Sequence, residues 1–202
     1  MKLQTTPYLE CLPVWPQEGQ HILACHDDTH IWVYQAFKPS IAEHAVRCGQ
    51  LAGPDFSLNR MSWIKPNFLW MMFRSGWATK PDQERILALR LERSFFDALL
   101  AQAVPSTHAA SSGLSMDQWK QAVASSAVRL QWDPDHDPSG APLRRRAVQL
   151  GLRGEVLKDF ATTAVSAIED ITPFVTEQRG HAMTDWSRLH VPRETVYPLA
   201  AP

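Results

Sequence analysis

The feature that most constrains the fold is an apolar segment, NFLWMMFRSGW, at residues 67–77. Pro66 precedes it, and proline is favoured at the first position of a helix. Gly76 is suited to ending that helix. Because nearly every position between them is apolar, a helix here has no polar face to turn toward water. The sequence therefore predicts a helix at residues 66–76 that is buried on every side, in the middle of the fold.

The composition supplies a core that can enclose such a helix. The chain has 202 residues, of which 45% are hydrophobic and 20% are charged, as in globular proteins. We therefore expect a single domain over residues 1–202. The formal net charge of −1 argues against a protein that its bulk charge holds to nucleic acid or anionic lipid.

The sequence contains neither a candidate membrane span nor an export signal. A bilayer crossing needs about 20 consecutive apolar residues, and no run in the chain approaches that length. The first residues, MKLQTTPYLECLPVWP, contain glutamate and prolines where a signal peptide carries an unbroken apolar stretch. We expect a cytoplasmic protein without a membrane partner.

The cysteines and histidines do not predict a metal site. Cys11, Cys25 and Cys48 are an odd number without CxxC spacing, which supports neither a disulfide framework nor a thiolate zinc site. His26 and His30 flank two aspartates, but a strand would hold these histidines about 13 Å apart, too far for one ion. We expect a polar turn before a strand, and no metal.

Alternating and helically spaced apolar residues predict the remaining elements. Strands are expected at residues 30–37, 61–64, 83–92, 128–132 and 146–152. Helices are expected at residues 39–47, 94–103, 116–125 and 154–168, with Gly49 ending the first and Ser115 capping the third. Residues 83–92 also contain helix-favouring types, and we choose the strand because apolar and charged residues alternate there.

The segments between these elements complete the predicted organisation. Residues 105–115 and 133–142 are rich in small residues or proline, so we expect two surface loops within one domain. The strands on either side of the second loop are expected to pair antiparallel. The chain beyond Pro173 is polar and is expected to wrap the surface. The predicted fold class is α+β, with a mixed or antiparallel sheet and about five strands and five helices.

Familiar catalytic motifs are missing, so chemistry has to be sought in polar residues within apolar segments. The chain lacks GxGxxG, GxxxxGK[ST], HExxH and GxSxG, the signatures of common dinucleotide, P-loop, zinc-protease and hydrolase sites. Gln35 and Gln149 each lie inside an apolar strand. A buried amide needs partners, so each is either a paired structural glutamine or a directional ligand contact. The arginines at 144–146 are either a solvated strand end or a phosphate-binding patch.

Cations and aromatic residues are mixed most densely at residues 59–77. The three cations and three tryptophans of this block are Arg60, Lys65, Arg74, Trp63, Trp70 and Trp77. Rings stack on tryptophan and phosphates pair with lysine or arginine, so a nucleotide is the simplest ligand that uses both. The alternative is a tryptophan-rich core whose charged side chains reach the surface.

Five blocks of the sequence resemble a family known as domain of unknown function 4291. These blocks are VYQAF, RMSWIKPNFLWMMFRSGWA, QERILALRL, VRLQWDPD and VQLGLRG. The resemblance runs over about residues 30–171 and implies a family-like core with N- and C-terminal segments that wrap the surface. The family label itself implies no activity.

The order of the blocks also looks like the ADP-ribosyltransferase fold, a more remote similarity. By that resemblance Gln35 takes the position of a His or Arg that ends the first strand, Ser62 or Trp63 begins the second unit, and Gln149 takes the position of a glutamate on a late strand. The transferases' glutamate binds a ribose hydroxyl and stabilises the cationic sugar that forms as nicotinamide leaves. A neutral glutamine departs from this pattern. Glu84 or Glu155 would then supply the charge, or the family runs different chemistry, such as a tRNA 2′-phosphotransferase-like reaction.

Two functions follow as expectations. The first is a nucleotide-binding enzyme of the ADP-ribosyltransferase-like class, with NAD as a possible substrate, an RNA or protein acceptor and no metal. Its catalytic positions are Gln35, Gln149 and Glu84, and its cofactor-binding positions are Arg60, Ser62, Trp63, Lys65, Arg74 and Trp77. The alternative is a module that binds RNA or single-stranded nucleic acid without catalysis, with tryptophans as stacking platforms.

Overall fold

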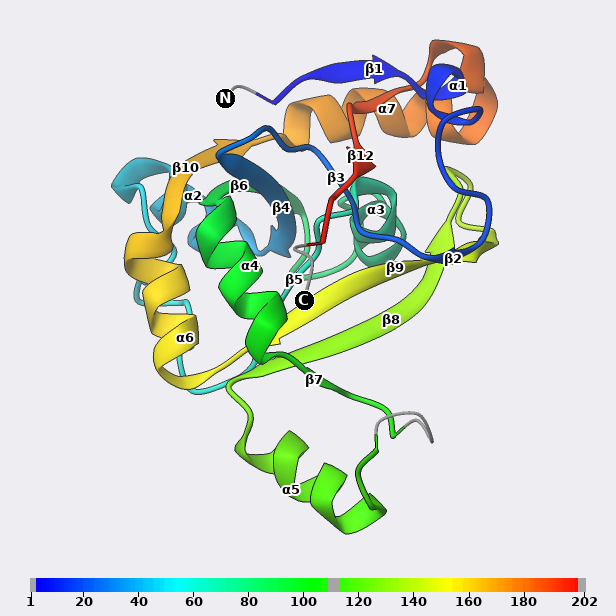
Figure 1. The fold of residues 1–202 in the computed structure, drawn as a ribbon. Coiled ribbons are helices and arrows are strands. Elements are labelled where there is room, and N and C mark those ends of the chain that lie inside the picture. The colour runs from blue at the N-terminus through cyan, green and yellow to red at the C-terminus, as the bar shows by residue number, and fades with distance from the viewer. Residues whose placement is uncertain (1–2, 109–112, 200–202) are drawn as a thin grey trace.

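Helices and strands are intermixed along the chain (Figure 1). The computed structural model describes residues 3–108 and 113–199, so residues 109–112 of the predicted loop at 105–115 lie outside the described residues. The strands are β1 (Thr5–Pro7), β2 (Gly19–Gln20), β3 (Leu23–Ala24), β4 (His30–Phe37), β5 (Ser62–Ile64), β6 (Arg85–Glu92), β7 (Val104–Pro105), β8 (Val128–His136), β9 (Pro142–Leu152), β10 (Val165–Asp170), β11 (His190–Pro192) and β12 (Thr195–Val196). The helices are α1 (Tyr8–Cys11), α2 (Pro39–Cys48), α3 (Phe68–Ser75), α4 (Arg93–Gln102), α5 (Met116–Ser125), α6 (Gly154–Asp159) and α7 (Thr172–Thr184), with a π-helical turn at Phe160–Ala164 and a 3₁₀ turn at Trp186–Arg188.

Two larger sheets form the framework. The first has three antiparallel strands in the order β10-β6-β4. The second has the order β2-β9-β8-β7, and β5 also pairs with β9. The β8–β9 pair is antiparallel, whereas the short β2 and β7 join their neighbours in parallel. The predicted single α+β domain with mixed and antiparallel sheets is therefore confirmed.

The first sheet is covered on both faces. Successive side chains of a strand point to opposite faces, and in β4 they enter two different hydrophobic clusters. Ile31 and Val33 belong to the first cluster, together with apolar residues of β9 and α4. Trp32 and Tyr34 belong to the second cluster, together with residues of α3. This explains why β4 reads as an almost unbroken apolar run.

The apolar helix α3 lies in the second cluster and is shorter than predicted. It begins at Phe68, because the side chain of Asn67 accepts a hydrogen bond from Trp70 N at 2.7 Å and caps the helix. Gly76 ends it at φ 60° in the left-handed region. Burial on every side is wrong for its last turn, where Phe73 is 38% exposed and Arg74 also lies at the surface.

The two larger sheets meet at a backbone contact. Tyr34 of β4 donates its amide hydrogen to Lys65 O at 2.7 Å, and Lys65 N donates to Tyr34 O at 3.2 Å. Lys65 directly follows β5, so this bridge connects the first sheet to the β5–β9 edge of the second. Polar side chains on either side of the bridge are thereby brought together from distant parts of the chain.

Several predicted elements are confirmed. The strand at residues 30–37 and the helix at 116–125 have the predicted bounds, and Ser115 and Gln118 form a reciprocal capping box. The helix that begins at Pro39 ends before Gly49, which adopts φ 70°. The predicted polar turn before β4 is also present, because Asp27 Oδ1 accepts hydrogen bonds from the backbone amides of Thr29 and His30.

The predicted loop at residues 133–142 is mostly wrong. The flanking strands extend into it as β8 and β9, and only a tight turn at residues 137–141 remains, held by hydrogen bonds from Ser139 N and Ala141 N to Asp137 Oδ1. Proline was the misleading signal. Pro134 is accommodated at a register irregularity in β8, one of the few sheet positions that tolerate it.

The predicted long helix at residues 154–168 is also wrong. Helix α6 passes into the π-helical turn and ends at Ala164, after which Val165 begins β10. The reason is tertiary, because β10 is the outer partner of β6 and completes the first sheet. The helical spacing of apolar residues carries no information about a strand partner elsewhere in the chain.

The C-terminal part does more than wrap the surface. Helix α7 packs on the second cluster, β11 pairs with β1, and β12 pairs with β3. Tyr197 is 2% exposed and belongs to the first hydrophobic cluster, and Glu194 is 3% exposed. Within the described residues, no helix has both the length and the apolar character that a membrane crossing requires.

Candidate functional site

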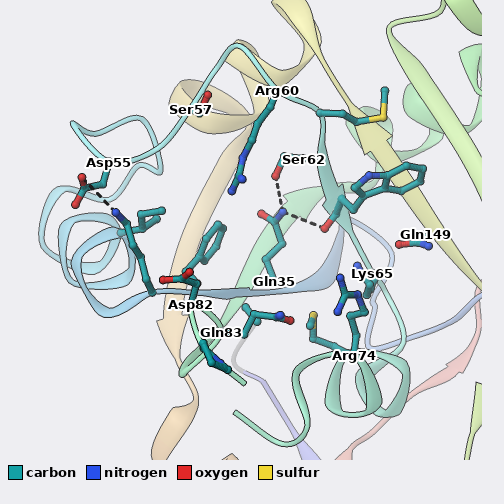
Figure 2. Close-up of a pocket in the computed structure, with 18 of the residues that line it drawn as sticks. Gln35, Asp55, Ser57, Arg60, Ser62, Lys65, Arg74, Asp82, Gln83 and Gln149 are labelled. Atoms are coloured by element: carbon teal, nitrogen blue, oxygen red, sulfur yellow. Dashed lines mark hydrogen bonds and ion pairs between the residues drawn. The ribbon is translucent and has the colours of Figure 1, made fainter. Parts of the chain in front are cut away.

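A cavity of about 950 Å³ opens where the two sheets meet (Figure 2). Its walls come from β4, β5, α3, β8 and β9, together with the connections at residues 55–61 and 81–83. Seven of the nine predicted site residues line it: Gln35, Arg60, Ser62, Trp63, Lys65, Arg74 and Gln149. These residues are up to 114 positions apart in the chain, as Gln35 and Gln149 are, so the fold and not local sequence brings them together.

Lys65 is the most unusual residue of this cavity. It is only 5% exposed, yet within the described part of the chain no group accepts a hydrogen bond or forms an ion pair with its ammonium. Burial lowers the pKa of Lys65 to about 8, and the neighbouring Arg74 guanidinium adds to this effect, while Asp133 opposes it. A buried cation without a protein partner makes the site favourable for an anion.

Two arginines extend the positive charge along the cavity. Arg60, before β5, and Arg74, on the last turn of α3, both lie at the surface and line the cavity. Neither side chain forms a hydrogen bond or ion pair with another described residue. At the other end, Lys38 is paired with Asp55 at 3.4 Å, and Asp82 adds a second carboxylate (Figure 2). The Lys65 end is therefore the one suited to phosphate.

Gln35 is fixed on one side and unsatisfied on the other. It is 4% exposed, and its Nε2 donates to Ser62 Oγ at 2.8 Å and to Trp63 O at 3.0 Å. Its buried Oε1 has no hydrogen-bond partner in the described structure. A buried acceptor without a partner is costly, so this oxygen is suited to a ligand donor.

Trp63 is placed by a close approach between strands. It pairs with Gly151 of β9, and a Cβ added at Gly151 would lie 2.6 Å from Met61 Sδ and 3.0 Å from the Trp63 ring. Only glycine leaves room for the indole to pack directly on the backbone of β9. The half-buried ring is thereby held at the cavity wall, where it can offer a flat surface to a ligand ring.

On β9, two positions before Gly151, Gln149 belongs to a small polar network. Its Nε2 donates to Asp133 Oδ2 at 2.8 Å, and Gln131 Nε2 donates to Asp133 Oδ1 at 2.8 Å. Gln131 and Gln149 are direct cross-strand partners, and both line the cavity. The Gln149 amide nitrogen is therefore paired within the protein, while the side chain still forms part of the cavity wall.

Two predicted site residues lie outside the cavity lining. Trp77 is 5% exposed, donates from Nε1 to Pro138 O at 3.1 Å and packs edge-on against Phe68. Glu84 accepts a hydrogen bond from the backbone of Asp82 at 3.1 Å. Both belong to the framework around the cavity and not to its wall.

The arginines at 144–146 are separated by the strand alternation. Arg145 is 4% exposed and forms a buried ion pair with Asp135, with 2.6 Å between Nη2 and Oδ2, and it also donates to Pro16 O. Arg144 and Arg146 are exposed. Within the described ranges, no three His, Cys, Asp or Glu side chains are grouped so that they could hold a metal ion.

Sequence reasoning missed several residues of this site, among them Gln131, which lines the cavity, and Asp133, which holds the Gln131 and Gln149 side chains. Gln131 lies within the alternating segment VRLQW, as Gln149 lies within AVQLGL. A polar residue within an apolar strand was therefore the sequence feature that could have identified Gln131. Asp133 was assigned to a loop because it begins the proline-rich stretch at residues 133–142.

The comparison with protein-family models decides the family. The model described as "Domain of unknown function (DUF4291)" matches residues 21–197. The chain belongs to the DUF4291 family. The match extends beyond both ends of the core expected at residues 30–171, in agreement with the buried C-terminal residues Glu194 and Tyr197. No curated protein matches the chain.

Proposed function

We propose that this DUF4291 chain binds a nucleotide, NAD or a related one, in the cavity between its two sheets. The observation that carries the proposal is Lys65, a buried cation at the wall of a cavity of about 950 Å³ without a partner in the described chain. A cavity of this size falls in the range of small-molecule sites. Lys65 and Arg74 would hold phosphate, Trp63 would stack on a ring, and Gln35 and Gln149 would orient ribose.

The class of chemistry rests on the remote resemblance to the ADP-ribosyltransferase fold. In its favour, the three positions that the resemblance selects, Gln35, Ser62 or Trp63, and Gln149, all line the same cavity. Against ordinary ADP-ribosylation, Gln149 is neutral, and neither Glu84 nor Glu155 lines the cavity. We therefore propose a transferase of this general class, acting on an RNA or protein acceptor, without a bound metal.

Calorimetry tests the binding proposal. NAD, ADP-ribose, ATP and GTP at millimolar concentration are titrated into the protein, and at least one is expected to bind. Lys65→Met should weaken that binding about tenfold to hundredfold, the usual scale for a hydrogen bond to a charged group. Lys120→Met is the matched control, because Lys120 lies on α5 away from the cavity and is 65% exposed. No heat with any of the four ligands would refute the proposal.

Nucleic-acid binding remains the second proposal. Trp70 and Trp77 are 7% and 5% exposed, and Arg145 is committed to Asp135, which leaves fewer groups for base stacking and backbone contacts. Single-strand binding that weakens steeply with salt, with no response to nucleotides, would reverse the order of the two proposals.

A further inference from the structure

The Asp133 carboxylate has both of its oxygens occupied by glutamine side chains. Gln131 Nε2 donates to Oδ1 and Gln149 Nε2 donates to Oδ2, each at 2.8 Å. A carboxylate accepts hydrogen bonds and does not donate them, so both amides must turn their nitrogens toward Asp133. The amide orientations are thus fixed by chemistry.

The two amide oxygens are consequently turned away from Asp133. Gln131 and Gln149 are opposite one another on β8 and β9, and both line the cavity. In Figure 2 the Gln149 oxygen lies on the side of Lys65 and Gln35, with the nitrogen on the far side. The wall therefore carries two neighbouring amides whose oxygens Asp133 does not hold, with one negative charge beside them on the same face of the sheet.

We infer that Asp133 is a positioning residue that makes this wall selective for ligands with a pair of hydroxyl donors. The inference rests on the proposed function, because it assigns the part of a nucleotide that this wall recognises. Each amide oxygen accepts one hydroxyl, and the carboxylate strengthens both hydrogen bonds by polarising the amides. Asp133 thereby places negative charge close to the position where the remotely similar transferases carry a glutamate, although Gln149 itself is neutral.

Asp133→Asn disturbs this arrangement with almost no change in shape. An asparagine offers one oxygen and one NH₂ group, so it can hold only one of the two glutamines in its present orientation. The other glutamine must turn its oxygen toward the NH₂ group of the substituted side chain and present its own nitrogen to the ligand. The wall then loses one acceptor, while the loss of the Asp133 charge also removes the carboxylate that opposes the lowered pKa of Lys65.

The test compares ATP with 2′,3′-dideoxyATP by calorimetry. The unmodified protein is expected to prefer ATP about tenfold, the scale of one or two neutral hydrogen bonds. Asp133→Asn should reduce this preference to about twofold or less. Inorganic pyrophosphate has no ribose hydroxyl, so its affinity measures separately the effect of the lost Asp133 charge on the Lys65 end of the cavity. Asp117→Asn is the control, because Asp117 is exposed on α5. A merely structural or electrostatic role of Asp133 would change the affinities for ATP and dideoxyATP by the same factor and leave their ratio unchanged.

The outcomes separate this inference from the binding proposal. Equal affinity of the unmodified protein for ATP and dideoxyATP, or an unchanged preference in Asp133→Asn, overturns the inference while nucleotide binding stands. If Asp133→Asn does not fold, Gln131→Leu is measured instead, since it removes one acceptor and keeps the Asp133–Gln149 pair. A loss of preference in Gln131→Leu supports the inference, and an unchanged preference overturns it. Absence of binding by ATP, dideoxyATP and pyrophosphate overturns the inference, and the binding proposal falls with it only if NAD, ADP-ribose and GTP also give no heat.

Discussion

Replacing Lys65 by methionine is expected to stabilise the folded chain at neutral pH. The substitution keeps most of the apolar stem and removes the ammonium, whose pKa falls from 10.5 to about 8 on folding. Each pKa unit corresponds to about 1.4 kcal/mol, so holding this charge in the fold costs about 3 kcal/mol. Lys65→Met should recover an amount of this order at pH 7.

The gain should depend on pH with a definite sign. Between pH 8 and 10.5 the unfolded chain binds a proton at Lys65 that the folded chain does not, so the wild type becomes more stable as pH rises. Below pH 8 the full cost is present. The advantage of Lys65→Met should therefore be constant near pH 7, decline above pH 8 and largely disappear near pH 10.5.

Urea unfolding of both proteins at several pH values measures this difference. Buried thiols act in the opposite direction, since burial raises the pKa of Cys11 and of Cys25 to about 11 and thereby lowers stability above pH 9. Both proteins contain these thiols, so their effect cancels in the difference. A difference that does not change between pH 7 and 10.5 would refute the assignment of Lys65 as a buried, unpaired cation.

Three further substitutions test the framework of the site. Trp70→Ala should cost on the order of 3–5 kcal/mol in urea unfolding, because Trp70 is 7% exposed and its removal leaves a cavity; a loss below about 1 kcal/mol would contradict its assignment to the core. Burial raises the pKa of Glu194 well above its usual value, so the stability of the wild type should fall as pH rises from about 4.5. Glu194→Gln should lessen that fall in thermal unfolding, and an equal dependence of stability on pH in both proteins would contradict the burial of an ionisable Glu194. Gly151→Ala should displace the Trp63 ring or Met61 and weaken nucleotide binding in calorimetry, because its Cβ would lie 2.6 Å from Met61 Sδ; unchanged affinity would exclude Trp63 as a stacking surface.

Local signals predicted the elements whose ends are set by their own residues. Helix α5 was predictable because Ser115 and Gln118 cap it, and α2 because Gly49 ends it. Strand β10 was not, since Val165 leaves the helical pattern to pair with Leu91 of β6, a residue far away in the sequence. Tertiary pairing overrides local periodicity in such a case.

The same distinction applies to the cavity. Gln35, Lys65 and Gln149 were noticeable as polar residues within apolar segments, and all three line it. Asp133 was not noticeable, because an aspartate at the start of a proline-rich stretch is ordinary in a loop. Its role depends on amides that β8 and β9 bring to it. Trp77 was predicted as a site residue because it lies near cations in the sequence, but it is a buried residue outside the cavity lining.

The buried Glu194 has a consequence for the time at which the N-terminal end of α3 is completed. Glu194 Oε1 accepts the hydrogen bond of Phe68 N at 2.7 Å, across 126 positions of the chain. At a synthesis rate of about 5–20 residues per second, residue 194 follows residue 68 by about 6–25 s. Throughout that interval the nascent helix lacks the carboxyl group that accepts the hydrogen bond of its first amide. If the chain binds a nucleotide as proposed, we expect capture to begin only after translation has passed residue 194, so that binding would mark a chain synthesised at least that far.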